Sequence, residues 1–531
     1  MRKFLIKPIV LMLSLLIFLT ACDDAKPEVK PDGALGTGRE VLSIVSGSEN
    51  KILEPILKEY AEDRNITIQM NYLGSLDIMR LLGQENFPYD AVWPAGSLWL
   101  DLGDEQHRSK HSESISLTPV VFGVRQSLAE ELNLTGREIS VADLLEPISA
   151  GDLKFCMTSA TQSNSGAMAY LGFLYAFADS PEVLTKDHLE DPELQENIQD
   201  LLAGVDRSSG SSNWLIDLFL HGDYDAMVNY EALIINLNET LVEEGKEPLT
   251  VLYPYDGLSV ADSPLAYIDQ GDAAKEERFL DLQAYLLSDE VQDQIQKTGR
   301  RISYEGIKDE NRAIFRTEWG IQPDRTIVPL PTPTADVINE SLMLYQTQFK
   351  KPSLNVYALD YSGSMSGQGN RQLKNAMNLL LDQEEAAKHL LQASESEVNI
   401  IIPFNQDPIA VLEASGSRQL DALNDEVQSY RPGGGTDIYA AASRALDELA
   451  DYDLNQYQAA IILMTDGKSG GNIRYFRTKY ENFGYDIPIF SISFGQADHR
   501  QLEELAELSR ARVFDGTEDL LSAFKEVKGY N

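Results

Sequence analysis

The residues best suited to chemistry lie in the last third of the chain, where hydroxyl and carboxylate side chains follow short apolar runs. An acid and two alternating serines come directly after the apolar run 354–359. A threonine in a glycine-rich turn, and an acid shortly after the apolar run 459–464, supply the same kind of oxygen. Such oxygens are hard ligands, so the pattern predicts a site for Mg²⁺ or Mn²⁺ rather than Zn²⁺. The candidate metal ligands are Asp360, Ser362, Ser364, Thr436 and Asp466.

The elements around these residues must bring the oxygens to one place. Apolar runs that end near an acid, alternating with longer amphipathic segments, are typical of strands and helices in an α/β fold. Ligands in such folds bind beyond the carboxyl ends of the strands, which is where these residues lie. Asp437, next to Thr436, is interpreted as the acid that starts the following helix and not as a ligand.

The order Asp-x-Ser-x-Ser, then Thr, then Asp resembles the von Willebrand factor type A (VWA) domain, and the resemblance covers residues 351–531. It implies a doubly wound, Rossmann-like fold with a metal-ion-dependent adhesion site. The hydroxyls of Ser362, Ser364 and Thr436 would ligate the metal, and Asp360 and Asp466 would hold it directly or through water. The resemblance also implies an open coordination position for a carboxylate of a partner protein, hence a binding module and not an enzyme.

A serine hydrolase remains as a minor alternative in the same region. Ser469 lies in Gly-Lys-Ser-Gly-Gly, which matches the Gly-x-Ser-x-Gly pattern, and His499 follows later in the chain. No acid is singled out as the third member of a triad, because Asp466 already belongs to the metal pattern. The same stretch lacks the first glycine of a phosphate-binding P-loop, since position 462 is an isoleucine.

The N-terminal part also alternates strands, for example 41–45 and 66–70, with helices. Three serine-rich turns, 46–49, 161–166 and 208–213, adjoin these elements. Hydroxyls at helix starts cap free N–H groups, and the same groups can bind an anion or a carbonyl. Three such turns in one domain favour a shared cleft. The candidate cleft residues are Ser48, Ser75, Ser97, Ser165, Ser212, Tyr230 and Glu231.

The order of these turns and of the later Tyr-Glu and Tyr-Pro-Tyr-Asp segments resembles the bacterial extracellular solute-binding proteins of the two-lobed, type 2 kind, over residues 39–325. The resemblance implies two α/β lobes that are hinged by crossing strands, the first at 116–124, and that close on a small solute. A proline-rich stretch and a helix at 337–349 then form a linker over 326–350. The predicted fold class is therefore α/β, with a two-lobed domain followed by a VWA domain.

The first residues predict export. A basic start, a short apolar core and Leu-Thr-Ala-Cys resemble a lipoprotein signal peptide over 1–21, with Cys22 as the lipidated residue and 22–38 as a tether. Asp23 resembles a signal for inner-membrane retention, if the cell is Gram-negative. The other cysteine, Cys156, lies in an apolar run and is predicted to be in the core. We expect a lipid anchor as the only membrane attachment.

Composition limits the partners. With 84 acidic and 44 basic side chains the formal net charge is −40, which disfavours nucleic acid as a partner. The sequence thus predicts a non-enzymatic envelope lipoprotein whose VWA domain binds a partner protein, while the N-terminal domain binds a small solute or acts as a docking scaffold. A second hypothesis makes the protein the solute receptor of a transport system.

Overall fold

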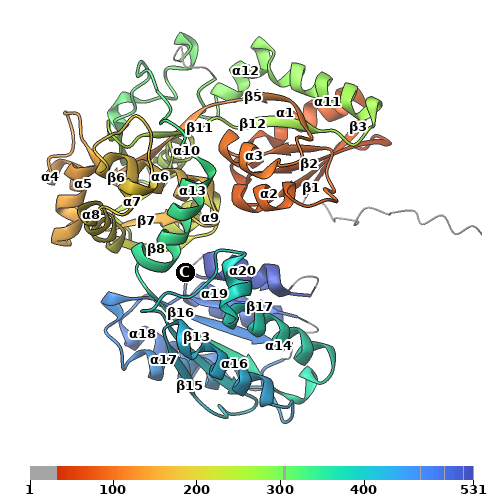
Figure 1. Cartoon of the computed structure of the whole chain (residues 1–531), viewed down its shortest axis with the longest axis vertical. Coiled ribbons are helices and arrows are strands. Elements are labelled where there is room, and N and C mark those ends of the chain that lie inside the picture. Colours follow the sequence, from red (N-terminus) through yellow and green to blue (C-terminus); the bar gives the residue numbers. More distant parts are fainter. Residues whose placement is uncertain (1–32, 303–306, 467, 495–496, 518–519, 530–531) are drawn as a thin grey trace, which may run out of the picture.

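The computed structural model describes residues 33–529 except for 303–306, 467, 495–496 and 518–519. The predicted signal peptide, Cys22 and most of the tether lie outside this range. The described chain forms three sheets covered by helices, arranged as two adjoining lobes and a C-terminal domain beneath them (Figure 1). The predicted α/β fold class is confirmed. No helix in the described part of the chain is long and apolar enough to cross a bilayer.

Lobe 1 is built on a six-stranded mixed sheet whose centre is parallel, because the second strand in the chain pairs in parallel with both of its neighbours. In order across the sheet the strands are β1 (Gly33–Leu35), β3 (Ile66–Tyr72), β2 (Glu40–Ser46), β4 (Ala91–Trp93), β12 (Pro264–Ile268) and β5 (Ser109–Ser114). Its helices are η1 (Ser48–Leu53), α1 (Glu54–Arg64), α2 (Ser75–Leu82), α3 (Ser97–Gly103), α11 (Ala273–Leu286) and α12 (Asp289–Gln296).

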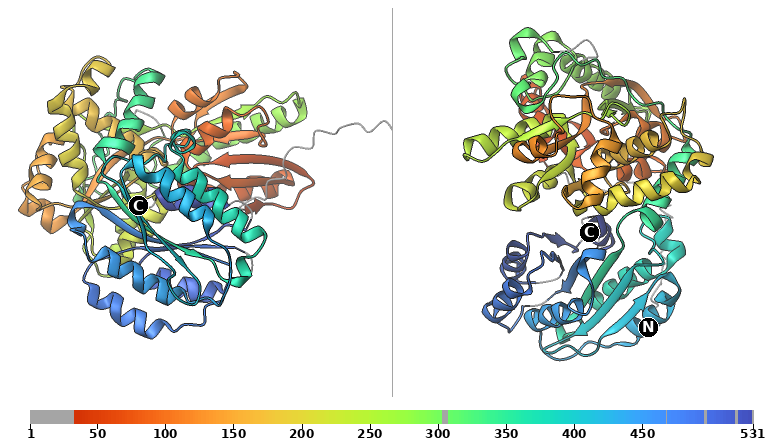
Figure 2. Two further views of the ribbon diagram at one scale, coloured as in Figure 1. Left: turned by 60° about the horizontal axis from the view of Figure 1, so that its bottom comes forward. Right: turned by 90° about the vertical axis from the view of Figure 1, so that its left-hand side faces the viewer.

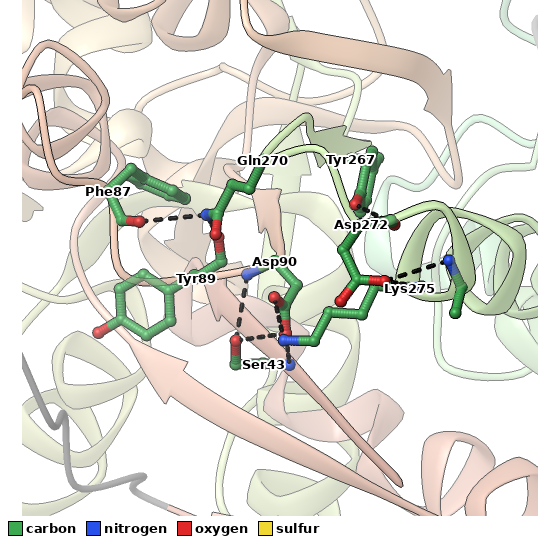
Figure 3. A network of polar contacts seen from close by, with 9 residues as sticks. Ser43, Phe87, Tyr89, Asp90, Tyr267, Gln270, Asp272 and Lys275 are labelled. Carbon is green, nitrogen blue, oxygen red and sulfur yellow. Dashed lines mark hydrogen bonds and ion pairs between the residues drawn. The ribbon is translucent and has the colours of Figure 1, made fainter. Parts of the chain in front are cut away.

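A buried carboxylate fixes helix α11 to this sheet (Figure 3). Asp90, 3% exposed, accepts hydrogen bonds from the amide and the hydroxyl of Ser43 at 2.9 and 2.8 Å. Its other oxygen lies 2.6 Å from Nζ of Lys275 on α11. Close by, Nε2 of Gln270 donates to the carbonyls of Phe87 and Tyr89 at 3.1 and 2.7 Å. The buried charge is therefore paired and hydrogen-bonded, as burial requires.

Lobe 2 has a second mixed sheet. Its strands run in the order β10 (Leu249–Leu252), β6 (Thr118–Arg125), β9 (Ala226–Tyr230), β7 (Phe155–Thr158) and β8 (Val205–Ser209), and β11 (Ser259–Ala261) also pairs with β6. Its helices are α4 (Gln126–Glu131), α5 (Val141–Ala150), α6 (Asn164–Phe177), α7 (Lys186–Leu189), α8 (Pro192–Ala203), α9 (Ser212–His221) and α10 (Glu231–Glu243). Cys156 in β7 is fully buried, which confirms its predicted place in the core.

The chain crosses between the two lobes three times. It passes from β5 to β6 through residues 115–117, returns between β11 and β12, and crosses again at Arg301, whose amide and carbonyl pair with those of Leu117. The first crossing is shorter than the predicted segment 116–124, because residues 118–124 already pair in the sheet of lobe 2. Beyond the third crossing lie two short turns, η2 (Asp309–Asn311) and η3 (Thr317–Trp319).

The helix predicted at 337–349 is present and packs on lobe 2. It consists of α13 (Ala335–Leu344) and a π-helical turn, η4 (Tyr345–Phe349). Its buried residues Val337, Ile338 and Leu342 join the apolar core of lobe 2. The hydroxyl of Tyr170 on α6 donates to the carbonyl of Ser341 at 2.8 Å. This segment therefore belongs to the packing of lobe 2 and does not float between domains.

The C-terminal domain has a six-stranded sheet with five parallel strands and one antiparallel edge strand. Helices pack on both faces, each over its own apolar cluster. In sheet order the strands are β15 (Leu412–Ser415), β14 (Val398–Phe404), β13 (Ser353–Asp360), β16 (Gln458–Thr465), β17 (Ile489–Ser493) and β18 (Val513–Asp515). One face carries α14 (Gln368–Leu381), α16 (Leu420–Ser429) and α20 (Leu520–Gly529), the other α17 (Ile438–Leu449), α18 (Ile473–Phe483) and α19 (His499–Leu508), and α15 (Gln383–Ala387) follows α14.

Lobe 2 contacts the C-terminal domain at the amino ends of its strands. Asp486, just before β17, lies 3.1 Å from a guanidinium nitrogen of Arg207 on β8 and accepts from the Tyr224 hydroxyl at 3.1 Å. A second nitrogen of Arg207 donates to the carbonyl of Arg510, shortly before β18, at 3.2 Å. The carboxyl ends of β13 and β16 therefore point away from lobe 2 (Figures 1 and 2).

Candidate functional site

The predicted metal ligands gather at the carboxyl ends of β13 and β16, which are parallel neighbours. Asp360 is the last residue of β13, and Asp466 directly follows β16. The hydroxyls of Ser362 and Ser364, in the turn after β13, lie 3.0 Å apart, and Ser364 Oγ donates to Asp466 Oδ1 at 2.8 Å. Four oxygen-bearing side chains from two distant segments thus face one place.

Asp360 is fully buried and held in position by two neighbours. One of its oxygens accepts from the amide of Ser362 at 2.7 Å, and the other from the hydroxyl of Thr465 at 2.7 Å. Burial raises the pKa of Asp360, and the nearby Asp466 adds to the rise. Burial also raises the pKa of Asp466. Both carboxylates therefore lie where a positive charge would stabilise their ionised forms.

The third predicted loop is bonded to the first. The amide of Gly363 donates to the carbonyl of Gly434 at 3.0 Å, and the amide of Gly433 donates to the carbonyl of Tyr361 at 2.8 Å. Gly434 has a φ of +87°, a conformation that glycine adopts without a steric cost. This loop carries Thr436 to the edge where the other candidates lie. The next residue, Asp437, caps α17 by accepting from two amides of its first turn, as the sequence predicts.

The donor set fits a hard divalent cation. It combines two carboxylates with serine and threonine hydroxyls, and Mg²⁺ completes such sets with water. Within the residues that the structure describes, no group of three or more His, Cys, Asp or Glu side chains comes together as a metal cage. The site in this domain is thus hydroxyl-rich, in line with the predicted Mg²⁺ or Mn²⁺ and not with a nitrogen- or sulfur-based zinc centre.

Ser469 has a structural setting. Its hydroxyl is 5% exposed and accepts from the amides of Ile438 and Gly471, both at 3.2 Å. Its own amide donates to the side chain of Gln501 on α19 at 3.0 Å. These contacts join the start of α17 to the turn after β16, and they do not favour the hydrolase alternative.

The three serine-rich turns of the N-terminal part converge, as predicted, on one cleft of about 500 Å³ between the lobes. The hydroxyls of Ser48 in lobe 1 and Ser211 in lobe 2 lie 3.3 Å apart, and Asn213 donates to the carbonyl of Ser48 at 2.6 Å. The polar wall also includes Ser75, which starts α2, and Asn164, which starts α6.

Three other predicted cleft residues lie one layer behind this wall. Ser165 and Ser212 are buried, with their hydroxyls 2.8 Å apart. Tyr230 is buried and accepts from Nδ2 of Asn164 at 2.9 Å, so it positions a residue that lines the cleft. Ser163 and Ser211, neighbours of the predicted serines in the same turns, line the cleft instead.

Glu231 and Ser97 lie away from the cleft wall. Glu231 is fully buried and makes a two-pronged ion pair with Arg301 at 2.8 and 2.9 Å, while Tyr253 donates to the same carboxylate. This contact stabilises the third crossing. Ser97 lines a separate hollow between the lobes, together with Asp262 and the proline-rich stretch 329–333.

The sequence reasoning missed a buried acid in the cleft. Glu49, next to the predicted Ser48, lines the cleft and is 8% exposed. Burial raises its pKa from 4.5 to about 7, although the nearby Arg300 opposes the shift. Arg512, from the C-terminal domain, also lines the cleft. Its place so far along the chain left no local signal that could have found it.

Comparison with known families divides the chain in the same way. The family model of the bacterial extracellular solute-binding proteins matches residues 42–301, and that of the von Willebrand factor type A domain matches residues 356–525. A search of the curated proteins found no significant match.

Solved structures with a similar arrangement share little sequence with this chain. A von Willebrand factor type A protein from Catenulispora acidiphila is 16% identical, with a TM-score of 0.30 over 34% of this chain and 43% of that one. A ferric binding protein from Campylobacter jejuni is 15% identical, with a TM-score of 0.41 over 57% and 98%. A periplasmic binding protein from Actinobacillus pleuropneumoniae, solved with fructose-6-phosphate, is 13% identical, with a TM-score of 0.39 over 50% and 85%.

Proposed function

The chain joins a bacterial extracellular solute-binding domain to a VWA domain, and from that premise we propose that it is an exported, non-enzymatic binding protein. In this proposal the VWA domain binds a partner protein through Mg²⁺ or Mn²⁺. The solute-binding domain takes up a small molecule or serves as a docking scaffold. The observation that carries the proposal is the meeting of three polar loops at the free edge of the VWA sheet.

The geometry of that edge supports a partner-binding role. Ser364 and Asp466 are in contact, and the edge points away from lobe 2, so a protein could approach it without displacing the lobes. A bound cation would supply a coordination position for a carboxylate oxygen of the partner. Asp360 and Ser362 are fixed by hydrogen bonds to the backbone and to Thr465, which would hold their oxygens ready.

Calorimetric titration of Mg²⁺ and Mn²⁺ into the chain without residues 1–21 tests the metal site. Asp360→Ala should abolish the binding heat, because it removes a carboxylate at the centre of the donor set. Ser366→Ala is the matched control, since Ser366 lies in the same turn and is exposed. Equal heats from the wild type and Asp360→Ala would contradict the proposal.

The cleft supports the second half of the proposal. Its 500 Å³ suit a small molecule, and its wall presents hydroxyls and amides from both lobes. If the chain is the receptor of a transport system, then deleting it should stop uptake of its solute. Uptake that persists in the deletion strain would leave the scaffold role.

The anchor belongs to the same proposal. Lipidation at Cys22 would tether the protein to the membrane surface, on the periplasmic face in a Gram-negative cell. Cys22→Ser should release the protein from the membrane fraction, whereas wild-type protein should partition into detergent. Equal partitioning of both proteins would contradict the anchor.

A further inference from the structure

The cleft between the lobes has a third wall, which comes from the VWA domain. Arg512, just before β18, lines the cleft together with Trp214 of α9. The guanidinium carbon of Arg512 lies 5.9 Å from the centre of the Trp214 ring and 5.5 Å from that of Phe514. Trp214 also packs against the apolar core of the VWA domain. One aromatic residue of lobe 2 thus links the cleft to the VWA domain.

The three bodies meet at the edge of the cleft, around Gln162. A methyl group on Gly74 of lobe 1 would come within 2.3 Å of the Gln162 carbonyl oxygen. A methyl group on Gly529, at the end of α20, would come within 1.6 Å of the Gln162 side-chain oxygen. Lobe 1 and the VWA domain both approach this residue of lobe 2 so closely that only glycine fits. The position of Arg512 is therefore set by packing and not by a loose domain contact.

The charges of the cleft favour a small anion. Among the acids that line it, Asp77 is paired with Arg80 at 2.8 Å, and the pKa of Glu49 is raised to about 7 by burial. The inner wall consists of neutral groups at the starts of α6 and α9, whose N-cap residues make no side-chain cap hydrogen bond. The amino ends of these helices attract negative charge. Arg512 adds a full positive charge opposite them.

A second observation indicates that a ligand is expected in this cleft. Oε1 of Glu49 is buried and has no hydrogen-bond partner among the residues that the structure describes. A buried polar atom without a partner is costly, and a ligand that carries a hydroxyl or similar donor would satisfy it. The cleft thus combines a position for an anionic group with a position for a donor.

We propose that Arg512 of the VWA domain is a ligand-binding residue of the cleft, and that a small, hydroxyl-bearing anion bound there joins the VWA domain to the two lobes. This inference rests on the solute-binding function proposed above. It adds the chemical class of the solute and a residue outside the solute-binding domain. Since coupling between sites is reciprocal, the anion would strengthen the docking of the VWA domain as much as docking strengthens anion binding.

The test is calorimetric titration of inorganic phosphate and of citrate into the full chain without residues 1–21. Arg512→Gln should weaken binding of the anion at least tenfold, and Arg512→Lys, which keeps the charge, should restore most of the affinity. Arg474→Gln on the exposed surface of α18 is the matched control and should bind as the wild type does. Circular dichroism melts of all variants separate loss of binding from loss of folding.

Hydrogen exchange supplies a readout that a site confined to the two lobes would not move. Phosphate or citrate should slow exchange in β18 and at the end of α20. Equal binding by the wild type and Arg512→Gln would overturn the role of Arg512 and leave a solute site in place. If neither anion binds but glucose does, then the anionic class is overturned and the solute function stands. No binding of any of these solutes would overturn the inference and count against the solute function.

Discussion

At the scale of single residues, burial decides what each polar group can do. Ser362 and Ser364 lie beside Asp466 at an open edge, whereas Ser469, only three residues further along the chain than Asp466, is enclosed and caps a helix. In the cleft, Ser48 lines the wall while Ser165 supports it from behind. The same hydroxyl chemistry therefore serves binding in one position and packing in another.

Glu49 should make stability depend on pH. Its carboxyl has a folded pKa of about 7 and an ordinary value of 4.5, so between these pH values the folded chain holds a proton that the unfolded chain has lost. The free energy of unfolding should therefore fall as the pH rises through this window, by up to about 3 kcal/mol. Glu49→Gln removes this contribution, so urea denaturation should show the variant gaining on the wild type between pH 5 and pH 8.

Arg300, which lies near Glu49 and opposes the shift, stays in place in this variant and makes the effect smaller. The exposed Glu59→Gln on α1 is the control and should change both pH values alike. A Glu49→Gln difference that is the same at pH 5 and pH 8 would show that Glu49 is ionised in the folded chain throughout.

At the scale of elements, the crossings between the lobes depend on a buried ion pair. Glu231 at the start of α10 and Arg301 at the third crossing are both at most 2% exposed. Glu231→Gln leaves the guanidinium buried without its carboxylate, which costs about 3–5 kcal/mol when a buried pair is broken. Denaturation in urea should show a loss of this order.

An exposed ion pair serves as the comparison. Glu244 and Lys246 lie 2.7 Å apart with both side chains about half exposed. Glu244→Gln should change the free energy of unfolding by less than about 1 kcal/mol. Similar small losses for both variants would mean that Arg301 finds other partners at the crossing, for example the carbonyl of Gln322, 2.9 Å away.

At the scale of the whole molecule, docking of the VWA domain depends on Asp486. Its carboxylate contacts Arg207, Tyr224 and Arg510 at 3.1, 3.1 and 3.4 Å. Asp486→Ala leaves Arg207, whose side chain is 8% exposed, without its acid and weakens docking by about 3 kcal/mol or more. Small-angle X-ray scattering should then give a larger radius of gyration.

Asp447→Ala is the control, because Asp447 pairs with Lys479 on the outer surface of the VWA domain. Metal binding by Asp486→Ala should match the wild type, since the metal site lies at the opposite end of the sheet from Asp486. An unchanged radius of gyration would show that apolar contacts such as that of Trp214 hold the domains together without this ion pair.

The sequence by itself determined the fold class, the strands and the metal pattern. Strands predicted at 41–45 and 66–70 are β2 and β3, and the apolar runs ending near Asp360 and Asp466 are β13 and β16. These features are local: an apolar run buried on both faces forms a parallel strand, and the residue that ends it must lie at the carboxyl edge of the sheet. The order of ligands along the chain thus already fixed where they would meet.

Tertiary structure alone decided which neighbour in each serine turn lines the cleft and which third body completes it. Successive residues at a helix start point in different directions, so Ser163 faces the cleft while Ser165 faces the core, and composition cannot tell them apart. Glu231 lies next to Tyr230 in the chain but is drawn to Arg301 at a crossing. Arg512 reaches the cleft only because the amino ends of the VWA strands dock on lobe 2, and such a contact depends on the packing of surfaces far apart in sequence.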